Sequence, residues 1–327
     1  MIDPEEIIEA KPWFTCAVPR DEMRAFMRKD NFHAVIYFGL WFLLLAAVGY
    51  LALRLYPSPW AIPAFFLYGV IYCGNTPRWH ETSHGTCFRT PWLNDVFYFF
   101  CGAMEFRDFV DFRWSHARHH SYTSMSGIDP EIAAPTPANL FHMVLDFFYL
   151  RMGYFAVRNL ILSSFGKPHS TLAAYVPDDQ FPRLFWSARA VLLLHLAAIL
   201  WAVLARSWLP VLFFTLPRFF GAPFLWMFIY LQHVGLDHDV WDHRLSTRSL
   251  RLNFFLSFLF MNMESHTEHH IFPLVPFHAL PRFRERLKDE LPPPYTSLLQ
   301  GTVELVPVLL RQQKDPSAHI VRPLPSK

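Results

Sequence analysis

Four long apolar runs limit what this chain can fold into: residues 34–53, 60–76, 184–205 and 208–232. Each run is close to the ~20 residues that a helix needs to cross a hydrocarbon core about 30 Å thick. A bilayer core offers the backbone no hydrogen-bonding water, so a single apolar run is stable there as a helix. Short turns join the first run to the second and the third to the fourth. The sequence therefore predicts an all-α integral membrane protein with four transmembrane helices in two hairpins, residues 34–76 and 184–232.

The composition agrees with a lipid environment. Hydrophobic residues make up 53% of the 327 residues and charged residues only 17%, which is more apolar than an ordinary soluble domain. The 29 basic residues nearly balance the 27 acidic ones, so the chain lacks the basic excess of a nucleic-acid-binding protein. The four cysteines form no C-x-x-C pair, so neither a disulfide framework nor a zinc knuckle is expected. The lipid bilayer is therefore an expected partner, and binding to nucleic acid is not expected.

The distribution of basic residues predicts the orientation in the membrane. The turns inside the two hairpins hold only Arg54 and Arg206, whereas nearly all other Lys and Arg lie in the N-terminal segment, the middle stretch and the C-terminal third. By the positive-inside rule, both termini then face the cytoplasm. We therefore expect a single multi-pass domain, residues 1–327, which lies in the cytoplasmic (inner) membrane if the source is bacterial.

The remaining segments are expected outside the hydrocarbon core. Residues 77–183 and 233–290 form a cytosolic cap in this scheme, and residues 291–327 form a proline-rich tail that ends in flexible coil. Within the cap, residues 139–165 have the pattern of an amphipathic helix at the membrane interface. The sequence thus divides the chain between two membrane hairpins and one cytosolic cap.

Eight of the 17 histidines fall in three clusters outside the apolar runs, and two of the clusters follow apolar stretches. The clusters are His80 and His84; His116, His119 and His120; and His266, His269 and His270. The outer members of each cluster are four residues apart, so on a helix they share one face, with Cβ atoms about 5–6 Å apart. Adjacent members diverge by about 100° around a helix, which suits two metal ions better than one. With His233, which follows the fourth run, nine imidazoles exceed the six positions of an octahedral ion, so the pattern predicts two ions.

The other histidines are weaker candidates for metal ligands. Four of them are expected to be solvated or interfacial: His33, His142, His169 and His319. His195, inside the third run, is either an interior histidine with a partner or a functional one. His238 and His243 follow the fourth run in an aspartate-rich loop and are weaker metal candidates. A histidine-rich transporter or a membrane haem protein stays open as a distant alternative, although either would place its histidines within the apolar runs.

Charged residues near the clusters and in the fourth run suggest supporting roles. Five carboxylates beside the clusters are candidates to orient the imidazoles: Glu81, Asp108, Asp111, Glu264 and Glu268. Arg218 lies deep in the fourth run, where a charge is costly. It is a candidate to bind an anionic group of the substrate, and the alternative is a structural pairing with an interior carbonyl or carboxylate. Unchanged substrate affinity and turnover in Arg218→Ala would exclude the role in substrate binding.

The three clusters resemble the histidine boxes of the membrane fatty acid desaturase and hydroxylase superfamily. The matching motifs are H-E-T-S-H at residues 80–84, H-A-R-H-H at 116–120 and H-T-E-H-H at 266–270, the last followed by Ile-Phe-Pro. Residues 262–281 are similar to the corresponding stretch of sphingolipid desaturases. The Gln-His-Val-Gly-Leu run around His233 resembles the extra histidine box of membrane alkane hydroxylases. The resemblance covers the chain from about residue 80 to residue 281.

This resemblance implies a fold and a metal centre. In that superfamily four transmembrane helices lie under a cytosolic helical cap that holds a di-iron centre, so the eight box histidines and His233 would be the iron ligands. Zinc can replace iron in such sites on overexpression, because imidazole binds both metals. Some relatives have an asparagine one turn before the isolated histidine, where this chain has Ile229. The water-mediated ligand held by that asparagine is therefore missing here unless Gln232 replaces it.

The resemblance also implies a reaction. The centre would be reduced by two electrons, bind dioxygen and abstract hydrogen from a substrate. The implied enzyme is a non-haem di-iron oxidoreductase, in the first place a desaturase of an acyl chain in a fatty acid or lipid. The alternative is a hydroxylase or monooxygenase of an alkyl chain or of a small apolar molecule, because the outcome depends on how the reacting atoms are placed.

The sequence shows none of the modules that would deliver the electrons. It contains no paired-cysteine cluster of the rubredoxin or ferredoxin type, no Gly-rich dinucleotide fingerprint after a strand and no appended haem domain. A separate electron-transfer protein is therefore expected: a ferredoxin, a rubredoxin or a b-type cytochrome with its reductase. Four basic residues are candidates to dock it, the alternative being a solvated basic helix: Arg282, Arg284, Arg286 and Lys288.

Overall fold

The computed structural model describes residues 11–325, and the regular elements in this range are helices. Residues 11–325 contain no β-strand, and an isolated bridge joins Leu250 to Tyr295. The all-α class predicted from the sequence is therefore confirmed. The chain forms two compact units, which are described separately below. Unit 1 consists of residues 1–29, 114–140 and 228–327, and unit 2 consists of residues 30–113 and 141–227.

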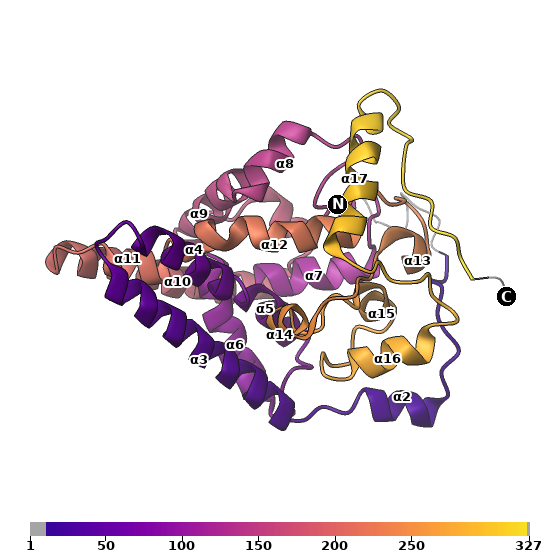
Figure 1. Cartoon of the computed structure of the whole chain (residues 1–327), viewed down its shortest axis with the longest axis horizontal. Helices are drawn as coiled ribbons and strands as arrows, with labels where there is room; N and C mark the ends of the chain where they lie inside the picture. Colours follow the sequence, from indigo (N-terminus) through magenta and orange to yellow (C-terminus); the bar gives the residue numbers. More distant parts are fainter. Residues whose placement is uncertain (1–10, 326–327) are drawn as a thin grey trace. The chain divides into compact units, whose positions relative to one another are not determined.

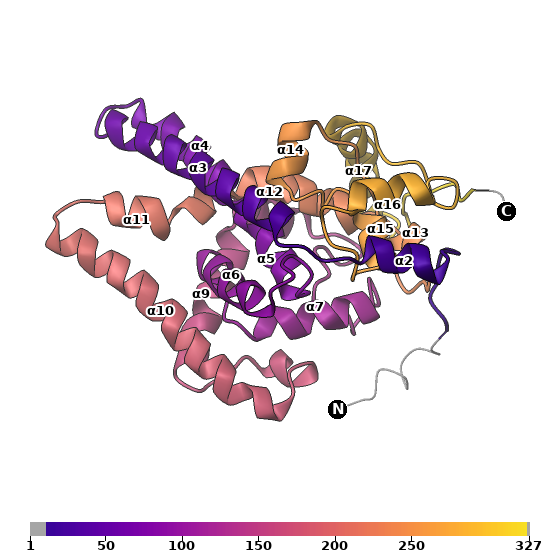
Figure 2. The ribbon, with the colours of Figure 1, turned by 90° about the horizontal axis from the view of Figure 1, so that it is seen from below.

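Unit 2 contains long apolar helices. The helices that lie wholly or mostly in it are α3 (Phe32–Leu55), α4 (Ala61–Tyr72), α5 (Asn75–Ser83), α6 (Pro91–Met104), α8 (Leu140–Phe147), α9 (Leu150–Ser164), α10 (Phe181–Leu204), α11 (Leu209–Phe214) and α12 (Pro217–His233), with two short 3-10 helices, η1 (Ser170–Ala174) and η2 (Asp178–Gln180). Helices α3 and α4 lie side by side as a hairpin (Figure 1). Figure 2 shows α10 turning back into α11. These two turns are the ones that the sequence places inside its predicted hairpins.

Unit 1 is built from shorter helices. They are α2 (Arg20–Phe26), α13 (His243–Ser246), α14 (Phe254–Leu259), α15 (His266–Ile271), α16 (Leu280–Leu287) and α17 (Leu298–Gln312), together with the C-terminal parts of α7 (Asp111–Ser121) and α12 (Pro217–His233). Helix α17 lies in the proline-rich tail, where the sequence predicted no helix. Ser297 caps it by accepting a hydrogen bond from the backbone N–H of Gln300 at 3.1 Å. The buried side chains of Leu305 and Val308 anchor α17 in unit 1, which offsets the cost of Pro307 inside the helix.

Within residues 11–325, three helices are long and apolar enough to cross a membrane: Phe32–Leu55, Asp178–Leu204 and Leu209–His233. They match the first, third and fourth apolar runs of the sequence. A fourth candidate is the pair α8–α9, which is bent by 71°. This pair lies in residues 139–165, the segment that the sequence predicted to be a helix at the interface. The structure therefore supports three membrane-crossing helices, or four if the bent pair is counted as one.

The second apolar run does not form a helix of transmembrane length. Helix α4 has 12 residues and ends at Tyr72, and α5 begins at Asn75 after a turn at Cys73 and Gly74. Pro77 has no N–H and so cannot bond the carbonyl of Cys73, four residues earlier. The apolar composition of this run predicted one continuous helix, and the proline explains why the structure has two.

Helices α4 and α12 make backbone contact within unit 2. A Cβ atom on Gly221 of α12 would lie 1.9 Å from the carbonyl oxygen of Gly69 on α4, and a Cβ on Gly69 would lie 2.9 Å from the Gly221 nitrogen. No larger residue fits at either position without a shift of backbone. Small residues that let helices approach closely are typical of packing inside a membrane.

Candidate metal centre

Seven of the nine predicted ligands lie in unit 1 and come from three helices. Helix α7 carries one histidine cluster, α15 carries another, and His233 is the last residue of α12. The short helix α15 is held in place at its start, because Ser249 accepts a hydrogen bond from the backbone N–H of Thr267 at 3.0 Å. Ser249 also donates a hydrogen bond to the carboxylate of Glu268 at 2.5 Å. These contacts position the histidines of α15.

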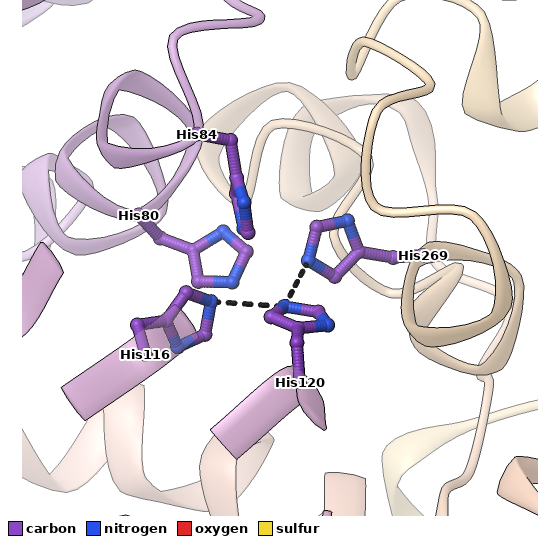
Figure 3. Close-up of side chains that lie close together, drawn as sticks. All are labelled: His80, His84, His116, His120 and His269. Atoms are coloured by element: carbon purple, nitrogen blue, oxygen red, sulfur yellow. Dashed lines mark hydrogen bonds between the residues drawn. The ribbon is translucent and has the colours of Figure 1, made fainter. Parts of the chain in front are cut away.

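The first group of ring nitrogens joins α7 to α15. His116 and His120 of α7 point toward His269 of α15 (Figure 3). Nε2 of His120 lies 3.1 Å from Nε2 of His116 and 3.1 Å from Nε2 of His269. A ring nitrogen of each of these residues lies within 4.8 Å of those of the other two. The four-residue spacing on α7 therefore brings two imidazoles to one point, as the sequence predicted.

The second group joins the same two helices to the end of α12. Ring nitrogens of His119, His233 and His270 lie within 4.8 Å of one another. Nε2 of His266 lies 2.7 Å from Nε2 of His233 and 3.1 Å from Nε2 of His270. The isolated His233 thus lies among the box histidines of unit 1. Neighbouring residues such as His119 and His120 fall in different groups.

Two carboxylates orient ligand candidates of α7. Glu131 accepts a hydrogen bond from Nδ1 of His116 at 2.8 Å, and Asp129 accepts one from Nδ1 of His119 at 2.8 Å. Each bond leaves Nε2 of that ring as the nitrogen with a free lone pair in the neutral tautomer, and Nε2 of His116 is the atom that faces His120. Hydrogen bonds of this kind set the tautomer and the basicity of metal-binding histidines.

A backbone carbonyl and a hydroxyl bind Nδ1 of two histidines in the second group and so fix their tautomers. The carbonyl oxygen of Ser246 accepts from Nδ1 of His233 at 3.2 Å. The hydroxyl of Thr123 donates to the His119 carbonyl at 2.8 Å, so its oxygen accepts from Nδ1 of His270 at 3.1 Å. Nε2 of both rings is then unprotonated and points into the group. Four histidines are therefore held in the tautomer that binds a metal through Nε2.

Burial and charge tune two of these imidazoles. Burial lowers the pKa of His270 well below its ordinary value, so the ring is neutral near pH 7 and keeps its lone pair. Burial also acts to lower the pKa of His119, but the carboxylate of Asp129 outweighs it and the pKa is raised. A more basic imidazole is a stronger donor to a metal ion.

The spacing of the nitrogens fits transition-metal coordination. Two imidazole nitrogens bound to one ion at about 2.0–2.1 Å and at right angles to each other lie about 3 Å apart. The Nε2–Nε2 separations of 2.7–3.1 Å within the two groups are close to this value. An all-nitrogen donor set of neutral imidazoles suits iron, copper, nickel or zinc and disfavours magnesium or calcium. The residues present therefore fit a pair of first-row transition-metal ions.

The remaining two predicted ligands lie in unit 2. His80 is on α5 and His84 is the residue that ends this helix. Their ring centroids are 5.1 Å apart, so the two imidazoles share one face of the helix, as their four-residue spacing predicted. Both side chains are also drawn in Figure 3.

Three of the carboxylates that the sequence predicted to orient imidazoles bind other groups instead. Glu264 accepts a hydrogen bond from Ser257 at 2.6 Å, and Glu268 accepts one from Ser249. In unit 2, Asp108 caps the start of α7 by accepting from the backbone N–H of Asp111 at 2.9 Å. Sequence reasoning missed Asp129 and Glu131, which lie about ten residues after the second box.

Arg218 and His195 both have interior partners in unit 2. Nε of the buried Arg218 donates to the Glu105 carboxylate at 2.5 Å, and its guanidinium lies 3.9 Å from the ring centroid of Tyr149. This geometry agrees with the structural pairing that the sequence left open for Arg218. Nε2 of His195 donates to the carbonyl of Ala103 at 3.0 Å, and its ring stacks on Phe106 at 4.2 Å. His195 is thus an interior histidine with a partner.

The loop after α12 brings two weaker candidates near the centre. His238 lines a small cavity together with His119 and His233. His243 is buried, and its ring centroid lies 5.3 Å from that of His270. Gln232 donates a hydrogen bond to the carbonyl of Met263 at 3.3 Å, so its amide is engaged with the backbone.

Comparisons with known proteins agree with this site. The model of the "Fatty acid desaturase" family matches residues 57–301, which include all three histidine clusters and His233. A curated protein described as "Delta(9) fatty acid conjugase-like enzyme", from Dimorphotheca sinuata, is 24% identical over 264 residues, which are 72% of this chain and 69% of that protein. Helices that can cross a membrane and buried histidine groups that can hold metal are what a membrane oxidoreductase of this kind requires. The chain is therefore a membrane protein that belongs to the fatty acid desaturase family.

Proposed function

We propose that this protein is a dioxygen-dependent desaturase of an acyl chain in a fatty acid or lipid, with two iron ions held by its histidines. The observation that carries the proposal is the inward orientation of Nε2 in His116, His119, His233 and His270. Buried imidazoles gather in this way at the cost of desolvation, which metal coordination offsets. Membership of the fatty acid desaturase family and a relative described as fatty acid conjugase-like support the substrate class.

The proposed iron ligands are the nine histidines predicted from the sequence. They are His80, His84, His116, His119, His120, His233, His266, His269 and His270. Bound iron would supply the oxidising chemistry with dioxygen that no side chain of this protein can supply. The residues of the protein set the tautomers of the ligands and bury the centre. The carboxylates of Asp129 and Glu131, which bind His119 and His116, balance part of the positive charge of the metal ions.

The proposal includes the surroundings of the enzyme. Both termini face the cytoplasm, following the basic residues outside the hairpin turns, and the membrane is the inner one if the source is bacterial. A separate one-electron carrier supplies the electrons. Arg218 has a structural role, because its guanidinium is already bonded to Glu105 inside the fold.

The test follows the mass of the product. Cells that express the wild type, or His269→Ala/His270→Ala, are supplied with isotopically labelled dioxygen, and their lipids and medium are compared by mass spectrometry. His142→Ala, at an exposed position outside the centre, is the matched control. We expect an acyl chain lighter by two mass units with the wild type and the control, and none with the double variant.

Two other results would contradict the proposal. A product heavier by one labelled oxygen would show hydroxylation of an alkyl chain in place of desaturation. Identical lipids in all strains, with iron bound to the wild type and a working electron carrier supplied, would exclude an acyl substrate. Zinc in the purified protein would not decide the matter, because imidazole sites accept both metals.

A further inference from the structure

An N-terminal segment of unit 1, residues 11–19, runs along the same unit close to the second group of histidines. The backbone N–H of Phe14 donates to the carbonyl of Trp241 at 3.0 Å. The indole N–H of Trp13 donates to the carbonyl of Ser121, the last residue of α7, at 3.2 Å. The guanidinium of Arg244 lies 3.3 Å from the ring centroid of Phe14. Hydrogen bonds and a cation–π contact therefore fix this segment in one place.

Three aromatic rings lead from this segment to the metal centre. The indole of Trp13 stacks on the imidazole of His243, with ring centroids 4.0 Å apart and planes within 3° of parallel. The His243 ring is in turn 5.3 Å from that of His270, a proposed iron ligand. His243 is buried and Trp13 is half-buried. A continuous aromatic path thus runs from the surface of unit 1 to a ligand of the centre.

We propose that the path Trp13–His243–His270 is the route by which electrons enter the metal centre, and that an acidic one-electron carrier protein docks beside Trp13. This inference rests on the proposed function. Desaturation removes two hydrogens from the acyl chain, and together with two electrons and two protons these reduce one dioxygen to two waters. The carrier is oxidised twice in each turnover, one electron at a time. The protein must therefore provide an entry point that a carrier can reach.

The physical argument for the route is distance. Electron transfer slows steeply as the gap between donor and acceptor grows, so a buried centre needs either a close carrier or intermediate π systems. The stacked pair of Trp13 and His243 shortens the gap between the surface and the ring of His270, whose Nε2 points into the second group. Nearly parallel contact between two rings gives the largest overlap of their π orbitals.

The charge of the neighbouring surface fits an acidic carrier. Helix α2 packs against α16 through Phe26 and Phe283, whose ring centroids are 5.0 Å apart. Over residues 11–29 and 280–289 the exposed basic residues outnumber the three exposed acidic ones; they are Lys11, Arg20, Arg24, Arg28, Lys29, Arg282 and Lys288. Such a surface steers an oppositely charged protein and raises its association rate.

Three of the four basic residues predicted for docking have partners in unit 1, and one of them, Lys288, pairs with Glu285 at 2.5 Å. Arg284 donates to the carbonyl of Leu250 at 2.8 Å, and Arg286 pairs with Glu22 at 2.8 Å. These contacts fix α16 and tie it to α2. The positive charge that faces a carrier therefore comes mainly from residues 11–29, with Lys11, Arg20, Arg24, Arg28 and Lys29.

The route is tested by flash photolysis, without any natural carrier. The four native cysteines are all buried, so a ruthenium-bipyridyl photosensitiser can be attached selectively at Lys11→Cys of the full-length, iron-loaded protein. With ascorbate as the sacrificial reductant, a flash reduces the label, and the transfer of one electron to the centre is followed optically. We expect Trp13→Leu and His243→Leu to slow this transfer by on the order of tenfold, while Trp13→Phe, which keeps a ring, retains most of the rate.

The controls separate the route from a loss of structure. The ring of Trp241 packs edge-on to Trp13, with centroids 4.9 Å apart, and lies outside the stack. The rate of electron transfer in Trp241→Leu should therefore equal that of the parent. Iron content and reduction by dithionite should be the same in every variant. Equal flash-induced rates in the parent, Trp13→Leu and His243→Leu would overturn the route. A parent protein that binds no iron, even after bound zinc has been removed and ferrous iron supplied, would instead overturn the proposed function.

Docking is tested with a reduced, acidic [2Fe–2S] ferredoxin as the probe. We expect it to reduce the centre at a rate that falls with added salt, and we expect Arg20→Glu/Arg24→Glu to lower that rate without changing reduction by dithionite. Reduction that does not depend on salt or on these two residues, or no reduction at all, would remove the acidic carrier from the proposal.

Discussion

At the scale of single residues, the tautomer of each imidazole is what makes the histidines useful. An imidazole has two nitrogens, and a ligand geometry forms only if the correct one carries the lone pair. Here Glu131, Asp129, Thr123 and the Ser246 carbonyl each bind an Nδ1. Because two of these partners are charged and two are neutral, the four imidazoles differ in basicity. All four imidazoles present Nε2 to the metal site.

Asp129 gives the sharpest prediction at this scale. Asp129→Asn replaces a charged acceptor by an amide that can turn its NH₂ toward His119, so the tautomer is no longer fixed. We expect the affinity for iron to fall about 10–100-fold, as is usual for partners of metal-binding histidines. The measurement is iron per protein after equilibration with a competing chelator.

A control for this variant is available elsewhere in unit 1. Asp315 is exposed and accepts a hydrogen bond from the Ser317 hydroxyl at 2.6 Å. Asp315→Asn should retain the iron of the wild type. Equal iron retention in Asp129→Asn would show that His119 does not depend on this carboxylate.

The sequence predicted which histidines lie together better than it predicted the side chains that hold them in place. The i, i+4 spacing of His116 and His120 is visible in the sequence because it follows from helix geometry. Asp129 and Glu131 follow in a Pro-containing turn, and no spacing rule links them to the box. Only the return of the chain brings the Asp129 carboxylate to His119, where it also accepts from the backbone N–H of Ser124 at 2.8 Å.

At the scale of elements, apolar length predicted the long helices but not their breaks. The runs at 34–53 and 184–205 became α3 and α10, since nothing in them interrupts the backbone hydrogen bonds. The prediction that residues 60–76 form a single span was wrong. Pro77 has no N–H to continue the helix, and α4 ends at Tyr72. Helix α17 forms in the proline-rich tail because one of its apolar faces is buried in unit 1. No local sequence pattern predicted that burial.

The crossing of α4 and α12 can be tested with one methyl group. Gly221→Ala would place its Cβ within 1.9 Å of the Gly69 carbonyl, so the backbones must separate. Overpacking of this kind costs about 1–3 kcal/mol. We expect a lower midpoint of thermal unfolding for the protein in detergent.

Gly39→Ala is the matched control, because a Cβ at Gly39 of α3 meets nothing within 4 Å. Its unfolding midpoint should change little or rise slightly, since alanine favours a helix by up to about 1 kcal/mol over glycine. Equal loss of stability in both variants would mean that the close crossing is not the cause.

At the scale of the whole molecule, the position of the basic residues predicts the orientation in the membrane. A green fluorescent protein fused to the C-terminus should fluoresce, because it folds in the cytoplasm. An alkaline phosphatase fused after Ser207, in the turn between α10 and α11, should be active, because that turn faces the other side. The opposite pattern of the two reporters would reverse the proposed orientation.

The composition of unit 1 has a consequence for biosynthesis. Its histidines come from two distant stretches of chain, and His120 and His269 are 149 positions apart. A ribosome delivers the chain from the N-terminus at about 5–20 residues per second, so α7 waits for its partner histidines while α8 to α14 are made. On the proposed function, the full set of iron ligands is present only after α15 has been made. Insertion into the membrane and loading with metal are therefore separate events, and a cell short of iron would accumulate inserted but metal-free protein.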